Sequence, residues 1–156
     1  MHRLGALLAS LLRAGDLVVL SGGLGAGKTT LAQGVGRGLG VRGDVTSPTF
    51  VIARVHPSTV GGPALVHVDA YRLSSLDEVD DLDLDASLED SVTVVEWGEG
   101  KVEGLAEDRL LVHIARPVGG DVPSGSDVDE PRTVTVTTTG ARWDGVDLDV
   151  LATAVA

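Results

Sequence analysis

The chain has 156 residues, a length typical of one domain, and 43% of them are hydrophobic, which argues against global disorder. It carries no cysteine, which excludes disulfides and thiolate metal sites and is compatible with a reducing, cytoplasmic environment. The formal net charge of −11 disfavours tight binding of nucleic acid by this chain alone, because that affinity comes mostly from lysine and arginine.

The first half of the chain predicts a helix, a strand and a second helix. Leucines at helical spacing predict the first helix over residues 3–14, and a buried strand is predicted at 17–21. The alternative for the N-terminus is a secretion signal, but a glycine-rich loop follows at once, which favours a helix facing the core. The second helix is predicted at 28–39, although its glycines weaken it locally. No apolar run approaches the about 18 residues of a membrane span, so no membrane association is predicted.

Short apolar and β-branched runs predict five further strands, at 50–55, 64–69, 92–97, 109–116 and 132–140. The acidic segment 74–91 has apolar residues at helical spacing and is either a solvated face or a docking surface for a basic partner. Residues 117–131 predict a mobile surface loop, and the C-terminus a short helix. Together these elements predict one α/β domain over residues 1–156, with some antiparallel pairing late in the chain.

The strongest chemical signal is the stretch SGGLGAGKTT, residues 21–30, which fits the pattern G-x-x-x-x-G-K-[ST]. Glycines allow successive N–H groups to point at phosphate oxygens, Lys28 would reach the terminal phosphates, and the Thr29 hydroxyl would face Mg²⁺. A chance glycine-rich turn is the alternative, but the strand before and the helix after favour a nucleotide loop. Lys28 is expected to face solvent when the loop is empty. The predicted contacts to the nucleotide are Gly23, Leu24, Gly25, Ala26, Gly27, Lys28, Thr29 and Thr30.

Two acids end predicted strands, and these are the candidate partners of the loop. Asp69 ends ALVHVD and Glu96 ends VTVVE. Ligands of such sheets bind at the carboxyl ends of the strands, so either acid could hold Mg²⁺ or orient the attacking water. The alternative for each is an exposed loop acid or a helix cap, and spacing alone leaves open which one touches the metal.

A Ser/Thr/Pro segment after the second helix is either an ordinary turn or a switch that senses the γ-phosphate, through Thr46, Ser47 and Thr49. The sequence contains no asparagine, and hence no Asn-Lys-x-Asp segment, so ATP is favoured over GTP. His67 and His113 alternate with apolar strand residues and are predicted to be satisfied structural histidines.

The motifs GGLGAGKTTL, VTSPTF, HVDAYRL and VEWGE, in this order, resemble the TsaE family of small bacterial ATPases required for threonylcarbamoyladenosine (t6A) formation in tRNA. The resemblance covers about residues 4–116. The expected fold is a P-loop NTPase-like three-layer sandwich with a mostly parallel, partly antiparallel central sheet.

The resemblance also implies roles for individual residues. ATP would bind the loop, Thr29 and Glu96 would coordinate Mg²⁺, and Trp97 would lie near the nucleotide. Lys28, Asp69 and Glu96 form the expected catalytic set. The implied partners are the transferase subunit TsaD and its inactive paralogue TsaB, which bind the tRNA. ATP hydrolysis, slow alone and stimulated by these partners, would reset their complex between turnovers.

The chain departs from the family pattern at three places. Gly23 stands where the family usually has an acid, the N-terminus is short, which predicts an incomplete nucleoside pocket, and the loop at 117–131 is long. The alternative functions are a P-loop small-molecule kinase and a nucleotide-dependent binding switch. A kinase usually needs a lid with arginines, and arginines are sparse between Thr29 and Asp69.

Overall fold

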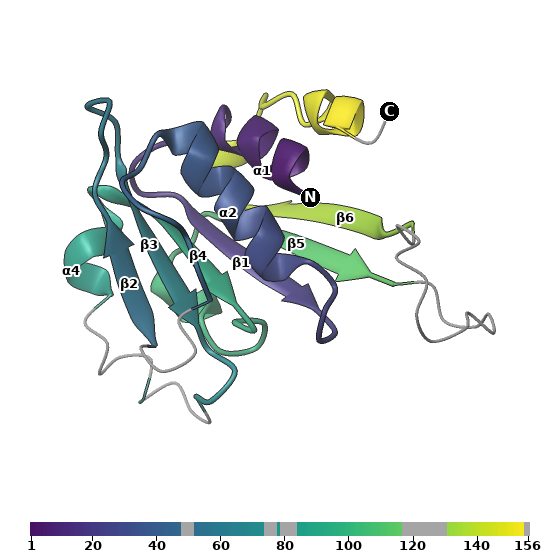
Figure 1. Ribbon diagram of the computed structural model, residues 1–156, viewed down its shortest axis with the longest axis horizontal. Helices are drawn as coiled ribbons and strands as arrows, with labels where there is room; N and C mark the ends of the chain where they lie inside the picture. Colours follow the sequence, from purple (N-terminus) through teal and green to yellow (C-terminus); the bar gives the residue numbers. More distant parts are fainter. Residues whose placement is uncertain (48–51, 74–77, 79–83, 117–130, 155–156) are drawn as a thin grey trace.

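The computed structural model describes residues 1–47, 52–73, 78, 84–116 and 131–154. Thr49, the start of the strand predicted at 50–55, half of the acidic segment 74–91 and nearly all of the loop predicted at 117–131 lie outside these residues. The helices and strands of the fold lie within the described ranges (Figure 1).

A mixed sheet of six strands forms the centre of this part of the chain, in the order β2-β3-β4-β1-β5-β6. Strands β1, β3, β4 and β5 run parallel, whereas β2 and β6 pair antiparallel at the two edges. This confirms the predicted α/β class with a mostly parallel, partly antiparallel sheet. The strand bounds are Leu17–Gly22 (β1), Ala53–His56 (β2), Ala64–Asp69 (β3), Ser91–Glu96 (β4), Arg109–Ala115 (β5) and Thr133–Thr139 (β6).

Helices cover both faces of the sheet. The helix α1 (His2–Ala9) and the helix α2 (Lys28–Leu39) lie over one face, with the 3₁₀ helix η3 (Asp149–Ala154) beside α1. The short helix α4 (Asp85–Leu88) and the 3₁₀ helix η1 (Glu103–Leu105) belong to the opposite face, and a further 3₁₀ turn, η2 (Ala141–Trp143), follows β6. None of the helices in the described ranges has both the length and the apolar character that crossing a membrane requires.

The predicted end of the first helix was wrong. The helix α1 stops at Ala9, and the amides of Leu11 and Leu12 then bond to carbonyls three residues back, as in a tight turn. Both leucines still pack against the core from this turn. The periodic leucines therefore report which side chains are covered, and not how far the α-helical hydrogen bonding continues.

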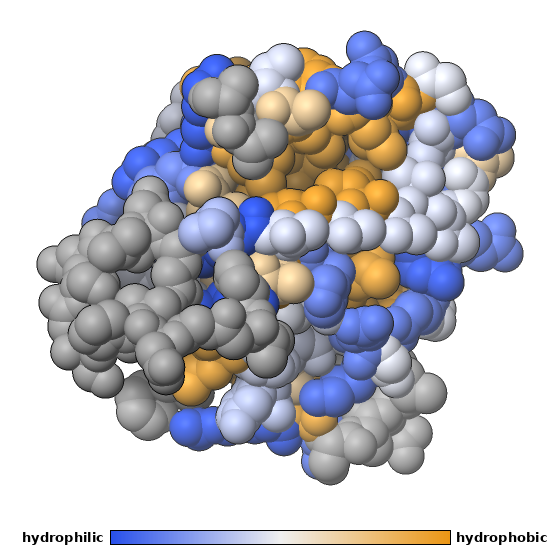
Figure 2. Space-filling model, turned by 90° about the vertical axis from the view of Figure 1, so that its right-hand side faces the viewer, coloured by the Kyte–Doolittle hydropathy of each residue, from blue (hydrophilic) through white to orange (hydrophobic). Residues whose placement is uncertain are grey.

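The hydrophobic core has two parts, one on each face of the sheet, and β1 contributes to both. Val18 and Leu20 face α2, whereas Leu17 and Val19 face the opposite layer. All four are at most 1% exposed, and a shift of one residue would exchange the two faces, so burial on both sides fixes the register of β1. On the side of the molecule seen in Figure 2, hydrophobic residues gather near the C-terminal segment, where partly buried side chains of α1, β6 and η3 adjoin the core.

Glycines allow α1 and α2 to cross at close range. A Cβ atom on Gly34 would overlap the backbone oxygen of His2, and one on Gly5 would overlap the backbone oxygen of Leu31. A Cβ on Gly38 would lie 2.5 Å from that of Ala9. Gly34 and Gly38, two of the glycines that weaken the helix prediction from sequence, are thus residues that let the two helices touch.

Replacing Gly34 with alanine is expected to lower the free energy of unfolding by about 1–2 kcal/mol. Overpacking costs about 1–3 kcal/mol, which outweighs the up to about 1 kcal/mol that alanine gains in helix propensity. Chemical denaturation measures the change. Gly104→Ala is the matched control, because no atom lies within 4 Å of its added Cβ. A Gly34→Ala variant as stable as the wild type would contradict the close crossing.

Candidate nucleotide-binding site

The carboxyl ends of three neighbouring parallel strands meet at one edge of the sheet. In the strand register, Asp69 of β3 pairs with Glu96 of β4, and Glu96 pairs with Leu20 of β1. The glycine-rich loop leaves β1 two residues after Leu20 and enters α2 at Lys28. The sheet therefore brings the two acids of the predicted site side by side, next to the loop.

The loop needs glycine at two positions for its backbone path. Gly22 has φ 143° and Gly27 has φ 110°, in the region that disfavours residues with a side chain. A Cβ atom on Gly22 would also overlap the backbone oxygen of Ile114 on β5. Gly27 immediately precedes α2, and the first N–H groups of a helix lack partners within the helix. These amides are available to an anion bound at the loop.

A cavity of about 550 Å³ lies at this edge of the sheet. Ten of the predicted site residues line it, together with three residues that were not predicted. The predicted ones are Leu24, Gly25, Gly27, Lys28, Thr29, Thr30, Ser47, Asp69, Glu96 and Trp97. The others are Ile52, Tyr71 and Arg72.

Among the predicted nucleotide contacts that the structure describes, three do not line this cavity. Gly23 lies in the loop, and its carbonyl accepts a hydrogen bond from Lys28. Ala26 is 1% exposed and packs into the hydrophobic core. Thr46 lines a smaller neighbouring hollow, and its hydroxyl accepts a hydrogen bond from Arg54 over 3.3 Å. The segment at Thr46 and Ser47 thus separates two hollows, and only Ser47 reaches the larger one.

Lys28 does not face solvent, contrary to the expectation from sequence, because its side chain folds back over the loop. It is 5% exposed, and its Nζ donates to the carbonyls of Gly22 and Gly23 over 2.7 and 2.8 Å. The same nitrogen lies 3.7 Å from the centroid of the Trp97 ring, within cation–π range. Burial lowers the pKa of Lys28, and the carboxylates of Glu96 and Asp69 act in the opposite direction.

Trp97 reaches the cavity from an unusual backbone position directly after β4. It is the one non-glycine residue with positive φ, 60°, in the described chain, and its N–H donates to the carbonyl of Leu20 over 3.0 Å. Its ring meets that of Tyr71 edge-on, with 5.0 Å between centroids. Such a backbone costs about 1–3 kcal/mol and is found mostly at functional sites, which fits the place of Trp97 beside the loop.

Glu96 is the centre of a short chain of buried hydrogen bonds. It is 3% exposed, its Oε2 accepts from the Thr29 hydroxyl over 3.1 Å, and its Oε1 lies 2.8 Å from Nε2 of His67. The prediction that His67 is a satisfied structural histidine is only half right, since Nδ1 has no partner among the described residues. His113 is exposed, with Nδ1 3.2 Å from the Ser21 hydroxyl, which also donates to Glu99.

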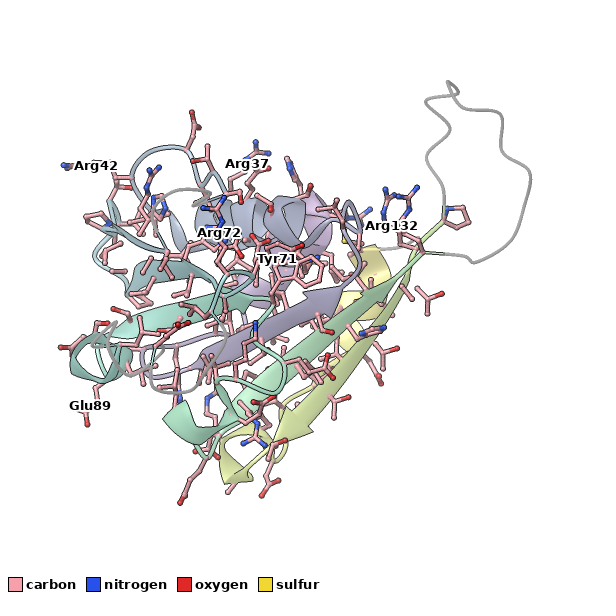
Figure 3. All side chains as sticks on the ribbon, turned by 90° about the horizontal axis from the view of Figure 1, so that it is seen from below. Arg37, Arg42, Tyr71, Arg72, Glu89 and Arg132 are labelled. Atoms are coloured by element: carbon pink, nitrogen blue, oxygen red, sulfur yellow. The ribbon has the colours of Figure 1, made fainter. Side chains whose placement is uncertain are left out.

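The residues that sequence reasoning missed follow the predicted acid closely. Tyr71 and Arg72 come two and three residues after Asp69, whose Oδ1 accepts from the Tyr71 amide over 3.0 Å. Figure 3 shows both side chains beside α2, whereas Arg42 lies at the periphery. Their place directly after a strand that ends in a site acid was an available signal. Arg72 also places an arginine at the cavity, three residues after the Thr29–Asp69 segment whose few arginines argued against a kinase-type lid.

Proteins that hold nucleotide phosphates on a glycine-rich loop between a buried strand and a helix form the P-loop class. The fold and the site make this chain a P-loop-like nucleotide-binding protein.

Comparison with known proteins narrows this class. The family model described as threonylcarbamoyl adenosine biosynthesis protein TsaE matches residues 1–119. A tRNA threonylcarbamoyladenosine biosynthesis protein TsaE from Streptomyces coelicolor is 68% identical over 153 residues, covering 97% of this chain and 99% of that protein. The protein of the same name from Mycobacterium tuberculosis is 55% identical over 120 residues, 72% of this chain and 71% of its own. The crystal structure of YdiB from Bacillus subtilis matches with a TM-score of 0.66 and 30% identity, over 99% of this chain and 86% of that one.

The chain belongs to the TsaE family, whose role is in the biosynthesis of threonylcarbamoyladenosine in tRNA.

Proposed function

We propose that this chain is a Mg²⁺-dependent ATPase that serves the t6A modification of tRNA together with TsaD and TsaB. One observation carries the proposal: Lys28, Thr29, Asp69 and Glu96 line a single cavity in a chain of the TsaE family. These are the residue types that phosphoryl transfer needs, namely a lysine for the phosphates, a hydroxyl and a carboxylate for the metal, and a second carboxylate for the attacking water.

Phosphate binding by the loop requires Lys28 to leave its present partners. The backbone N–H groups of the loop and of the first turn of α2 receive the phosphate oxygens. The amine of Lys28 exchanges the carbonyls of Gly22 and Gly23 for the terminal phosphates. These carbonyls and the Trp97 ring already hold the amine beside the loop. The exchange therefore needs only a short movement of the Lys28 side chain.

The side chains of Thr29 and Glu96 fit Mg²⁺. Their oxygens lie 3.1 Å apart, and Mg²⁺ prefers oxygen ligands, keeping several waters and phosphate oxygens in its shell. Bound there, the ion would neutralise charge that develops on the phosphate oxygens during hydrolysis. The hydrogen bond between Thr29 and Glu96 holds both groups in position beforehand.

Asp69 is the proposed orienter of the attacking water. It lies beside Glu96 in the register of β3 and β4, lines the same cavity, and is less buried than Glu96. One of its oxygens accepts from the amide of Tyr71, which fixes the carboxylate and leaves the other oxygen for water. The proposed switch consists of Thr46, Ser47 and Thr49 and senses the γ-phosphate. Of its two described members, Ser47 lines the cavity.

The partners supply the contact with tRNA in this proposal. A net charge of −11 leaves the chain poorly suited to hold the tRNA backbone by itself. TsaD and TsaB would bind the tRNA and carry out the transfer in the cytoplasm. ATP hydrolysis by this chain, slow alone and stimulated by the pair, would reset their complex.

The test is a hydrolysis assay that measures both ADP and inorganic phosphate from ATP and Mg²⁺, with and without TsaD and TsaB. We expect ADP and phosphate in equal amounts, a low rate for the chain alone, and a higher rate with the pair. ADP formed without phosphate, on addition of a small-molecule acceptor, would instead support a kinase, the alternative that Arg72 at the cavity favours. A rate indifferent to the pair would contradict the proposed partnership.

A further inference from the structure

The buried histidine behind Glu96 has no part in the function proposed above. We propose that His67 is the positioning residue for the Glu96 carboxylate, holding it in the orientation that binds Mg²⁺. This inference rests on the proposed function, since it concerns the same metal site. It assigns a role to His67, which does not line the cavity in the described chain.

The contacts of Glu96 leave it no other side-chain donor in the described chain. Oε2 accepts from Thr29 and Oε1 lies 2.8 Å from Nε2 of His67, while Glu96 is 3% exposed and His67 is 0% exposed. A carboxylate on a short side chain can turn about its last bond unless both oxygens are held. Thr29 must share its hydroxyl with an incoming metal, so His67 is the partner that remains when the metal is bound.

The chemistry of the two groups fixes where the proton lies. An ionised carboxylate only accepts hydrogen bonds, so Nε2 of His67 carries a proton and donates it to Oε1. The other ring nitrogen, Nδ1, is buried and has no hydrogen-bond partner in the part of the chain that the structure describes. A histidine retained only for its own stability would be expected to satisfy both nitrogens. The arrangement instead gives one directed hydrogen bond, aimed at the site carboxylate.

The strand register explains how the contact is made. His67 lies two residues before Asp69 on β3, so both side chains point to the face of the sheet that carries Glu96. His67 pairs with Val94, two residues before Glu96 on β4. The imidazole therefore reaches Glu96 along this face of the sheet, from a position nearer the start of the strands. His67 does not line the cavity in the described chain, so it can hold the carboxylate without competing for its ligand.

Three replacements of His67 separate its hydrogen bond from its bulk. Glutamine carries an amide N–H near the position of Nε2, asparagine carries one near the position of Nδ1, and leucine fills similar space without a donor. The Mn²⁺ affinity of each variant, saturated with adenylyl imidodiphosphate, is measured by electron paramagnetic resonance. Loss of a partner that orients a metal ligand typically costs about 10–100-fold in metal affinity. We expect that loss for His67→Leu and His67→Asn, and an affinity within about threefold of wild type for His67→Gln.

A second measurement shows whether His67 acts through Glu96. In a Glu96→Ala background, His67→Leu should lower the Mn²⁺ affinity no further, because the group that it positions is absent. Thermal unfolding of each variant is followed in parallel. If His67→Leu does not fold, the comparison of His67→Gln with His67→Asn still shows whether the hydrogen bond to Glu96 supports metal binding. Both variants carry an amide, and only that of glutamine lies near the position of Nε2.

The outcomes distinguish this inference from the function on which it rests. A wild-type chain that binds no Mn²⁺ beyond that held by the nucleotide analogue alone would overturn the proposed function, and this inference with it. A wild-type chain that binds Mn²⁺, with equal affinity in His67→Leu and His67→Gln, would overturn the inference alone. A further loss from His67→Leu in the Glu96→Ala background would also overturn it, because His67 would then act by another route.

Discussion

Replacing Lys28 with alanine is expected to abolish ATP hydrolysis and to weaken ATP binding by about 100-fold or more. A hydrogen bond to a charged group contributes about 1.5–3 kcal/mol, and Lys28 is proposed to contact two phosphates. The loss of about 3 kcal/mol corresponds to roughly 100-fold in the dissociation constant. Calorimetric titration with ATP measures the binding, and phosphate release measures the hydrolysis.

The fold should tolerate the loss of the Lys28 side chain. The freed carbonyls of Gly22 and Gly23 lie beside the space that the Lys28 side chain would vacate, and because Lys28 lines the cavity, water can enter there and replace the amine. Arg42→Ala is the charge-matched control, since it removes one positive charge from the periphery of the molecule (Figure 3). Unchanged binding and hydrolysis in a folded Lys28→Ala variant would show that the nucleotide does not use this loop.

Replacing Glu96 with glutamine is expected to lower Mg²⁺-dependent hydrolysis by about 10²–10³-fold, the usual effect of removing one group that stabilises transition-state charge. ATP affinity without Mg²⁺ should change little, because the loop and Lys28 hold the phosphates. Glutamine has the shape of glutamate, its carbonyl can accept from His67, and its amide can donate to the Thr29 hydroxyl. The variant should therefore fold and lose the metal site selectively.

The matched control for Glu96→Gln is Glu89→Gln, which removes the same charge from an exposed glutamate (Figure 3). Hydrolysis and ATP affinity are measured over a range of Mg²⁺ concentrations for both variants. A Glu96→Gln variant that keeps the Mg²⁺ dependence and the rate of the wild type would show that Glu96 does not hold the metal.

Local patterns in the sequence were enough to predict the parts of the fold that carry the site. The helix α2 has the predicted bounds, 28–39, and the strand β3 has the predicted bounds, 64–69. Both have sharp boundaries in the sequence, because the glycine-rich loop ends where α2 begins and the apolar run of β3 stops at Asp69. The place of Asp69 and Glu96 beside the loop also followed from the sequence, since the carboxyl ends of parallel strands share one edge of a sheet.

Contacts between distant segments could not be predicted from spacing. The bond of His67 to Glu96 depends on the register of β3 against β4, which no local pattern specifies. The burial of Lys28 depends on Trp97, which a turn after β4 carries over the loop. In both pairs the two residues lie far apart in the sequence, and they come into contact only because neighbouring strands are aligned. Tyr71 and Arg72 are a different case, because they follow Asp69 closely in the chain and could have been predicted from the sequence.

The most direct test of the central claim is the number of t6A nucleosides formed per TsaD–TsaB complex in a reconstituted reaction with tRNA, ATP and Mg²⁺. We expect many turnovers with the wild-type chain, and at most about one with Glu96→Gln or with no added chain, since hydrolysis at this site is proposed to reset the complex. Equal, multiple turnovers with the wild type and with Glu96→Gln would contradict that claim, because t6A formation would then proceed without ATP hydrolysis at the loop.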